Sequence, residues 1–328
     1  MRLVAFLARF GIAVGLTAYL LWRSNPSAVL DALSDVAWGP IGLAVLLVLA
    51  DRALMAYRWI QLLCIVEPAS RPPLSSILRV FFVSSFLGTF LPASVGGDAV
   101  RAYSLRSLRV QTSDAVASVV VDRITGLASV LLMALLGLLL ARDLAANLAV
   151  MVAVGASAAV CALFFVLIAS RRAGAGATAV FTRLPGRLGS IGQRVVDSLQ
   201  RYSRFAPQLV NVLFCSVAVQ VLRIVQAYFL GLGLGMTAPL EAYFAFIPLI
   251  LIVMLLPVTI NGIGTSQAGF VWLFARAGVG APEAFALSVL FVALGIVGNL
   301  PGGVLFALGA ARESSDDAYE SRNTRNHP

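Results

Sequence analysis

The chain contains 328 residues, of which 60% are apolar and 12% are charged. A mean hydropathy of +0.93 excludes a water-soluble globular protein, whose surface needs many more polar side chains. The formal charge of +9 comes from arginine without any lysine, and no soluble basic domain gathers it, so we exclude nucleic-acid binding. His327 is the only histidine, and the cysteines stand singly in apolar segments. We therefore expect no histidine triad, no metal and no cofactor.

Long apolar segments predict an all-α integral membrane protein. A helix of about 20 apolar residues crosses the ~30 Å hydrocarbon layer at ~1.5 Å per residue. Six segments reach this length, at residues 3–22, 39–63, 115–141, 147–170, 208–234 and 284–310. We interpret the first as a retained span rather than a signal peptide, because no small-residue cleavage site separates it from a soluble region.

Two further apolar segments are interrupted and predict re-entrant helical hairpins. Residues 74–91 are followed by Pro92 and a short arginine-rich stretch that cannot cross back. Residues 240–256 lead through Pro257 into residues 265–278, which are short for a span. Both segments are expected to enter the bilayer and to leave on the same side.

The two hairpin regions resemble each other and indicate an internal repeat. Arg52 and Arg223 each begin an R-x-x-x-A-Y pattern, and the LPASVGG of the first hairpin corresponds to the LPVTING of the second. Each unit, at about 39–141 and about 208–310, consists of a span, a hairpin and a span. Because one extra span lies between them, the units are expected to be inverted.

The distribution of arginine predicts the orientation in the membrane. The polar segment 171–207 holds seven arginines and one aspartate, so we place it in the cytoplasm. Six spans then place both termini in the cytoplasm, and the loops expected outside carry little net positive charge. The prediction is a multi-pass protein of the cell membrane.

Residues 1–311 are expected to form one transmembrane domain. Within the cytoplasmic linker 171–207, Ile191, Val195 and Leu199 recur at helical spacing between arginines. This pattern is typical of an amphipathic helix on an anionic leaflet, and a solvated linker is the alternative. The polar residues 312–328 are predicted to be a disordered cytoplasmic tail.

The first hairpin carries candidate binding residues at its turn. Pro92 ends the entering helix, and Gly96 and Gly97 let the backbone approach a ligand closely. Asp98 and Arg101 can pair with each other, or a helix N-terminus and the guanidinium can bind a phosphate. A turn that satisfies only its own backbone through an N-cap is the alternative.

The second hairpin offers uncharged polar groups at the matching place. Pro257 stops a helix, Gly262 and Gly264 permit an unwound segment, and Asn261 and Gln267 supply hydrogen-bonding groups. Interrupted backbone at membrane depth is expected only where protein or a watery cavity surrounds it. Paired interruptions in inverted halves indicate a transport site near the midplane.

Charged residues inside the predicted spans complete the candidate site. Arg52 follows Asp51 in the second span, Asp122 and Arg123 lie in the third, and Arg223 lies in the fifth. Such groups are costly in hydrocarbon unless they are paired, so they serve either as structural ion pairs or as substrate contacts. Pseudo-symmetry would bring Arg52 and Arg223 towards one cavity.

Three sequence blocks, PASVGGDAVRAYSL, VDRITG and PVTINGIGTSQAGF, resemble the lysylphosphatidylglycerol synthase transmembrane region, a flippase-like family of bacterial and archaeal membrane proteins. The resemblance extends over about residues 1–311 and implies a location in the prokaryotic cytoplasmic membrane. Members fused to an aminoacyltransferase domain are associated with making and flipping aminoacylated phosphatidylglycerol. The printed sequence contains no such domain, and Gln267 stands where members often carry a glutamate, which argues against proton or cation handling there.

The leading hypothesis is a lipid flippase that moves a phosphate-bearing headgroup, aminoacylated or glycosylated, across the membrane. The expected partner is a phospholipid or lipid-linked substrate, with a separate lipid-modifying enzyme as a candidate second partner. A membrane-embedded transferase is one alternative, with Asp98 or Asp122 as its base, but no donor-binding domain is evident. A carrier for a small anionic solute is the other. We expect a transporter rather than an enzyme.

Overall fold

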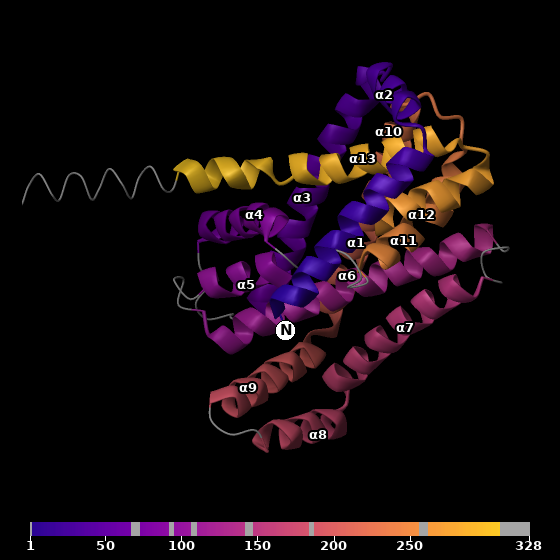
Figure 1. The fold of residues 1–328 in the computed structure, drawn as a ribbon. Helices are drawn as coiled ribbons and strands as arrows, with labels where there is room; N and C mark the ends of the chain where they lie inside the picture. Colours follow the sequence, from indigo (N-terminus) through magenta and orange to yellow (C-terminus); the bar gives the residue numbers. More distant parts are fainter. Residues whose placement is uncertain are drawn as a thin grey trace, which may run out of the picture.

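The computed structural model describes residues 2–66, 73–91, 95–105, 110–141, 147–183, 187–255 and 262–308. Every regular element in these ranges is a helix (Figure 1). Helices satisfy their backbone hydrogen bonds within each segment, which a bilayer without water requires. The predicted all-α membrane class is confirmed.

Five helices of the described chain, rather than the six expected, are long and apolar enough to cross a membrane. They are α3 (Trp38–Val66), α6 (Thr112–Leu140), α7 (Leu148–Ala169), α10 (Ala206–Gly233) and α13 (Ala281–Val297), whose helical path resumes at residues 300–308. The first expected span forms α1 (Arg2–Arg23). Its first nine side chains lie outside the described part, so its crossing stays a prediction.

Two shorter apolar helices occupy the places of the expected hairpins: α4 (Leu74–Phe90) and α11 (Leu240–Leu255). Their 17 and 16 residues extend only ~25 Å, less than the ~30 Å hydrocarbon layer. Each packs against the 10-residue helix that follows it, α5 (Val95–Ser104) or α12 (Thr265–Phe274). A 3-10 turn, η4 (Ala275–Ala277), then leads to α13.

The two units repeat one packing scheme. Helix α3 lies along its counterpart α10, and α4 packs on α5 as α11 packs on α12. Contacts between α5 and α6 match those between α12 and α13, and contacts between α6 and α10 match those between α13 and α3. Several of the contacts of one short-helix pair thus recur around the other, whereas α7 and α1 pack only against the second pair among the contacts of the described helices.

Glycines bring the long helices close to the short ones in both units. A Cβ atom at Gly137 of α6 would lie 2.8 Å from the carbonyl oxygen of Phe244 in α11. A Cβ atom at Gly302, in the continuation of α13, would overlap the carbonyl oxygen of Phe82 in α4. Small residues at such crossings let helices associate tightly in a membrane, where the hydrophobic effect does not drive them together.

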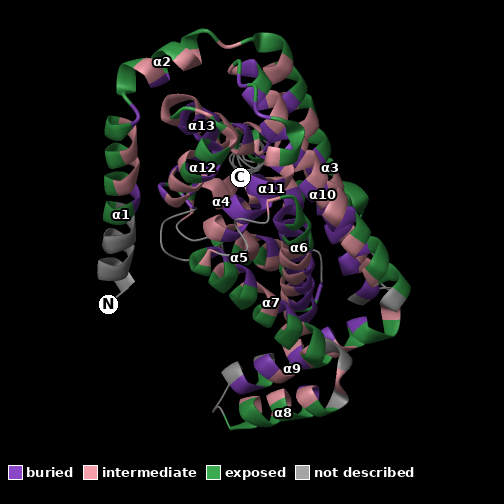
Figure 2. Cartoon of the chain, turned by 90° about the vertical axis from the view of Figure 1, so that its right-hand side faces the viewer, coloured by how far each residue is buried: buried purple, intermediate pink, exposed green. Residues whose placement is uncertain are grey.

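The remaining helices lie at the two ends of the bundle. Figure 2 shows α2 (Pro26–Ser34) at one end, and α8 (Arg171–Thr182) and α9 (Arg187–Arg201) at the other. The short helix η3 (Tyr202–Phe205) joins α9 to α10.

The apolar face of α9 differs from the sequence-based interpretation. Val196 and Leu199 are buried, and α9 packs against α6, α7 and α8. Ser198 donates to the buried Asp114 of α6 at 2.6 Å, and Arg201 forms an ion pair with the same carboxylate. The buried residues of α9 thus pack against protein, and the position of the helix on a lipid leaflet stays a prediction.

Candidate functional site

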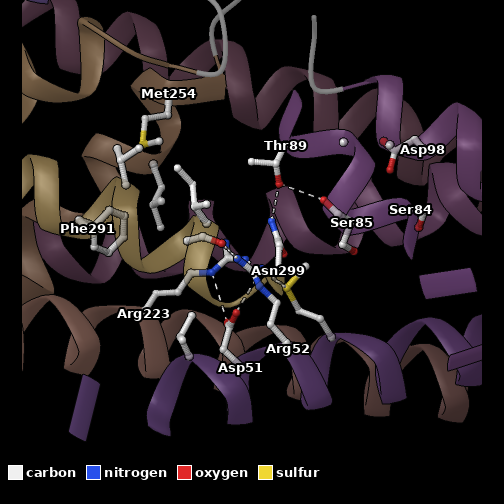
Figure 3. A pocket seen from close by; sticks show the side chains of 18 of the residues that line it. Asp51, Arg52, Ser84, Ser85, Thr89, Asp98, Arg223, Met254, Phe291 and Asn299 are labelled. Carbon is white, nitrogen blue, oxygen red and sulfur yellow. Dashed lines mark hydrogen bonds and ion pairs between the residues drawn. The ribbon is translucent and has the colours of Figure 1, made fainter. Parts of the chain in front are cut away.

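A cavity of about 410 Å³ is lined by residues of α3, α4, α5, α6, α10, α11 and α13 (Figure 3). This volume falls within the roughly 300–1,000 Å³ typical of small-ligand sites. Both units contribute to its wall, and the residues that follow the two hairpin turns, Gly97 and Ile263, line the same space. Its polar and charged lining residues are Asp51, Arg52, Ser84, Ser85, Thr89, Asp98, Arg101, Arg123, Arg223, Gln226 and Asn299.

The repeat-equivalent arginines Arg52 and Arg223 meet around one carboxylate. Asp51 of α3 has a side chain only 1% exposed and lies 3.4 Å from Nη1 of Arg52 and 3.4 Å from Nε of Arg223. Both guanidiniums also donate to the sulfur of Met55 at 3.3 Å. Two positive charges therefore share one negative charge, and Nε of Arg52 has no hydrogen-bond partner.

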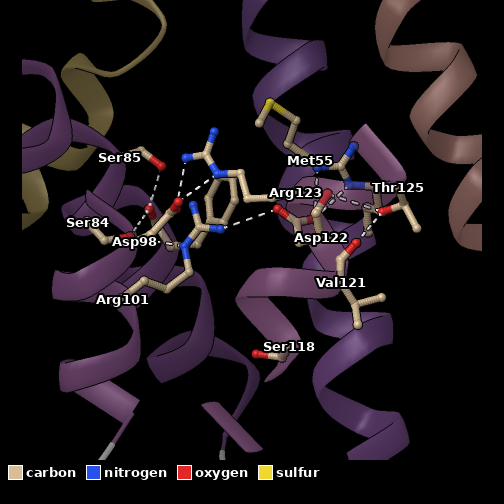
Figure 4. A network of polar contacts seen from close by, with 12 residues as sticks. Met55, Ser84, Ser85, Asp98, Arg101, Ser118, Val121, Asp122, Arg123 and Thr125 are labelled. Carbon is tan, nitrogen blue, oxygen red and sulfur yellow. Dashed lines mark hydrogen bonds and ion pairs between the residues drawn. The ribbon is translucent and has the colours of Figure 1, made fainter. Parts of the chain in front are cut away.

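A second ion pair joins the first hairpin to α6. Arg123 donates from Nε and Nη2 to the two carboxylate oxygens of Asp98, at 2.6 and 2.8 Å (Figure 4). This two-point geometry is the strongest that arginine and a carboxylate form. The Arg123 side chain is 51% exposed, so it is the most accessible of the paired arginines that line the cavity.

A third cluster extends from the cavity lining into the bundle: Arg101 lines the cavity, and Asp122 and Arg58 lie behind it. Asp122 accepts from Nε of Arg58 at 2.8 Å and lies 3.6 Å from Nη1 of Arg101. The guanidinium of Arg101 also lies 4.6 Å from the ring centre of Phe81 and 5.0 Å from that of Trp59, both cation–π distances. All three charged side chains are at most 6% exposed. This cluster holds α3, α5 and α6 together.

The cavity carries excess positive charge. Its described lining contains four arginines and two aspartates, which leaves two positive charges. Adding the adjoining Arg58 and Asp122 pair does not change that balance. An uncompensated cation is costly in a low-dielectric bundle, so the charge balance of the cavity favours an anion over a cation.

Hydroxyl and amide groups form another wall of the same cavity. Asn299 lies in the turn between Val297, the end of α13, and the helical residues 300–308, and it donates from Nδ2 to Oγ1 of Thr89 at 2.9 Å. Thr89 in turn donates to the carbonyl oxygen of Ser85 at 3.2 Å. The carbonyl oxygen of the Asn299 side chain is buried and has no hydrogen-bond partner.

The structure brings most of the predicted site residues together, but the ion pairs differ from those expected between sequence neighbours. Arg52, Asp98, Arg101, Arg123 and Arg223 all line the cavity, and Asp122 lies directly behind it. Asp98 pairs with Arg123 rather than with Arg101, and Asp122 pairs with Arg58 and Arg101 rather than with its neighbour Arg123. Neighbouring residues on a helix point about 100° apart, so each charge finds its partner on another helix.

Gln267 lies away from the cavity. Its Oε1 accepts from the backbone N–H of Gly264 at 2.6 Å and from the hydroxyl of Ser266 at 2.9 Å, at the start of α12. Gln267 is therefore a capping residue in this structure. Asn261, Pro92 and Pro257 lie outside the described residues.

The predicted turn glycines act in two different ways. Gly262 and Gly264 have φ angles of 74° and 89°, a left-handed backbone that favours glycine. Gly97 instead lies inside α5, where a Cβ atom would be 2.8 Å from the carbonyl oxygen of Ser84 and 3.0 Å from Cα of Gly88. Gly96 faces Leu91 in the same way. Gly96 and Gly97 thus allow α5 to pack closely against α4 and Leu91.

Sequence reasoning missed Arg58 and Asn299. Arg58 stands in an apolar span, so its charge was a usable signal, but its partner Asp122 is 64 positions away. Asn299 precedes Pro301 and two glycines, in a GNLPGG segment that resembles the breaks in both hairpins. That interruption was a signal for a polar site in the last span.

Comparison with protein families gives one match. The family described as the lysylphosphatidylglycerol synthase TM region matches residues 6–302. A comparison with curated proteins gives no match. Since the family covers most of the chain, including every described residue of the cavity, this protein belongs to the family of the lysylphosphatidylglycerol synthase transmembrane region.

Proposed function

We propose that this protein is a lipid flippase whose cavity binds a phosphate-bearing headgroup while the acyl chains remain in the bilayer. The observation that carries the proposal is the shared cavity of Arg52, Arg101, Arg123 and Arg223, with two positive charges in excess. Moving a headgroup through hydrocarbon is slow because its charge must leave water. A cationic cavity inside a helix bundle replaces that water.

The paired packing of the two units supports a transport mechanism. Helix α3 lies against its counterpart α10, and Arg52 and Arg223 come from these two helices. In inverted-repeat transporters, one repeat rocks against the other around a central site. Here such rocking would move α3 relative to α10 and alter how Asp51 is shared between the two arginines. We propose that this exchange opens the site to each leaflet in turn.

The orientation of the chain is part of the proposal. The arginine-rich helices α8 and α9 lie at the end of the bundle opposite α2, which carries Asp31 and precedes Asp35 (Figure 2). The positive-inside bias would place α8 and α9 in the cytoplasm. Both termini would then be cytoplasmic, in a cell membrane.

The geometry favours transport over the transferase alternative. Both oxygens of Asp98 accept from Arg123, and Asp122 is held between Arg58 and Arg101. Neither carboxylate has a free oxygen directed into the cavity to take a proton from a substrate. A carrier for a small anionic solute would use the same arginines, so an experiment must separate it from a flippase.

Purified protein in phospholipid vesicles provides the test. The vesicles carry a lipid labelled on its acyl chain, and an impermeant reductant reports the fraction of label in the outer leaflet over time. Arg223→Gln should slow exchange of an anionic lipid by at least about tenfold, corresponding to about 1.4 kcal/mol. Arg194→Gln, on the exposed face of α9, is the matched control and should exchange lipid normally.

Three outcomes distinguish the functions. Leaflet exchange with unchanged lipid masses supports the flippase. A lipid of altered headgroup mass indicates a transferase, and uptake of a labelled anionic solute without lipid exchange indicates a carrier. If the wild-type protein exchanges no lipid, or if Arg52→Gln and Arg223→Gln exchange lipid as the wild type does, the proposed function is wrong.

A further inference from the structure

We propose that the headgroup this cavity accepts is an anion that also carries hydroxyl groups, such as a phosphoglycerol or a glycosyl phosphate, and that cationic and zwitterionic headgroups are rejected. The inference rests on the proposed lipid-binding function and names its substrate class. Two independent features of the cavity carry it: the occupancy of its carboxylates and the hydrogen-bonding polarity of the wall formed by Ser85, Thr89 and Asn299.

The carboxylates in the cavity are already ion-paired. Asp98 accepts two bonds from Arg123, and Asp51 lies 3.4 Å from both Arg52 and Arg223, although its buried Oδ1 accepts no hydrogen bond. These are the acidic side chains among the described lining residues. The ammonium of an ethanolamine or aminoacyl headgroup would have to displace a guanidinium, and it would face the two excess positive charges.

A cation–π site for a headgroup amine is also missing from the described lining. Cages for quaternary ammonium groups are built from aromatic rings around the cation. Among the described residues that line the cavity, Phe291 alone is aromatic, and one ring does not make a cage. Trp59 and Phe81, the rings nearest to the charged clusters, already lie against Arg101. The cavity thus offers an amine neither a free carboxylate nor a cage.

The wall formed by Ser85, Thr89 and Asn299 requires donors. The hydroxyl of Ser85 donates to the carbonyl oxygen of Phe81 at 2.8 Å, and the hydroxyl of Thr89 donates to the backbone carbonyl oxygen of Ser85 at 3.2 Å. Their hydrogens are therefore used, and only lone pairs remain. The side-chain oxygen of Asn299 is buried without any donor. Leaving such an acceptor unpaired is unfavourable, so a substrate hydroxyl that donates to it would be selected.

The two walls together define the substrate. Guanidiniums favour a phosphate, and the acceptor wall favours neutral O–H donors attached to it (Figure 3). A phosphodiester bearing a glycerol or a sugar presents both groups. A headgroup with the phosphate but without hydroxyls would satisfy only the arginines, and an amine would be repelled by them.

Four acyl-labelled lipids test the inference in the vesicle assay. Phosphatidylglycerol has the anion and the hydroxyls, phosphatidylethanol has the anion alone, phosphatidylethanolamine is zwitterionic, and lysylphosphatidylglycerol is cationic. The expected order of exchange rates is phosphatidylglycerol first, phosphatidylethanol about tenfold slower, and the two amine lipids slower still. Exchange of either amine lipid as fast as phosphatidylglycerol would overturn the inference while leaving the flippase function intact.

Asn299→Leu tests the acceptor wall separately. It should lower phosphatidylglycerol exchange to the rate of phosphatidylethanol and leave phosphatidylethanol exchange unchanged. Asn211→Leu, on an exposed surface of α10 outside the cavity lining, makes the same chemical change and should preserve the preference. If Asn299→Leu slows both lipids equally, the hydroxyl selection is wrong.

Binding in detergent separates this inference from the transport step. Glycerophosphoglycerol should bind the purified full-length protein by titration calorimetry about tenfold more tightly than glycerophosphoethanolamine. Asn299→Leu should reduce this preference without abolishing it, because the excess positive charge still disfavours the amine, and Arg223→Gln should reduce both affinities. If no lipid is exchanged but this preference holds, the flippase function fails and the headgroup class stands. Equal binding of the two compounds would refute the class whatever the exchange assay gives.

Discussion

Asp98 and Asp122 should differ sharply in their effect on stability, although each stands beside or near an arginine in the sequence. Asp122 is the clearest case, because it neutralises Arg58 and Arg101 where all three side chains are at most 6% exposed. Asp122→Asn keeps the shape of the side chain but leaves two buried guanidiniums without a carboxylate. Breaking one buried pair in this way costs about 3–5 kcal/mol.

Asp98→Asn is the matched comparison. It also removes one carboxylate from an arginine, but the Arg123 side chain is 51% exposed, while Asp98 is 12% exposed. Exposed pairs contribute about 0–1 kcal/mol, so the loss should lie close to that range and well below the loss for Asp122→Asn. The predicted difference in unfolding free energy between the two variants is therefore at least about 2 kcal/mol.

Unfolding in mixed micelles, followed by circular dichroism as denaturing detergent is increased, measures both variants. A third variant, Asp122→Asn combined with Arg58→Gln, should recover part of the loss, because it removes one of the two uncompensated charges. Equal losses for Asp122→Asn and Asp98→Asn, or a double variant less stable than Asp122→Asn alone, would refute this account of the buried cluster.

Three further predictions follow from individual contacts. Gly97→Val should separate α4 from α5 and cost about 1–3 kcal/mol of unfolding free energy, because its Cβ atom would lie 2.8 Å from the carbonyl oxygen of Ser84. Thermal unfolding in detergent measures the loss. The control Gly176→Val, at a position with open space around it, should be close to neutral. Asp114→Asn should loosen α9 from α6, because Ser198 loses a charged acceptor; faster proteolysis within α9, with unchanged cleavage elsewhere, is the expected result. Gln267→Leu should remove the cap of α12 and cost about 1 kcal/mol of unfolding free energy without changing headgroup affinity; a loss of affinity at full stability would return Gln267 to the binding site.

The arginines also rank differently as targets once their contacts are known. Sequence reasoning treats Arg101 and Arg223 alike, as charged groups that serve either as ion pairs or as substrate contacts. Arg101 is 5% exposed, pairs with Asp122 and lies against two aromatic rings, so its replacement should impair folding. Arg223 shares Asp51 with Arg52, which can still neutralise that carboxylate. Arg223 is therefore the cleaner test of substrate binding.

The sequence by itself determined the class of the protein and the location of its irregular segments. Long apolar stretches must be helices in a bilayer, because the backbone finds no other hydrogen-bond partners there. The short lengths of α4 and α11 and the left-handed glycines Gly262 and Gly264 follow from local composition. These features depend on neighbours within a few residues, so pattern and spacing are enough to predict them.

Only the tertiary structure decided which charged side chains pair with each other and what net charge remains in the cavity. Asp122 and Arg123 are adjacent in the chain, yet the first is sealed in a structural cluster and the second lies half-exposed at the cavity. The oxygen of Asn299 that lacks a donor and the packing of α9 on α6 were equally invisible in the sequence. Successive side chains of a helix point in different directions, and their partners come from helices far away in the chain. The excess of positive charge in the cavity is a sum over these distant pairs, so it can be known only when the helices are in place.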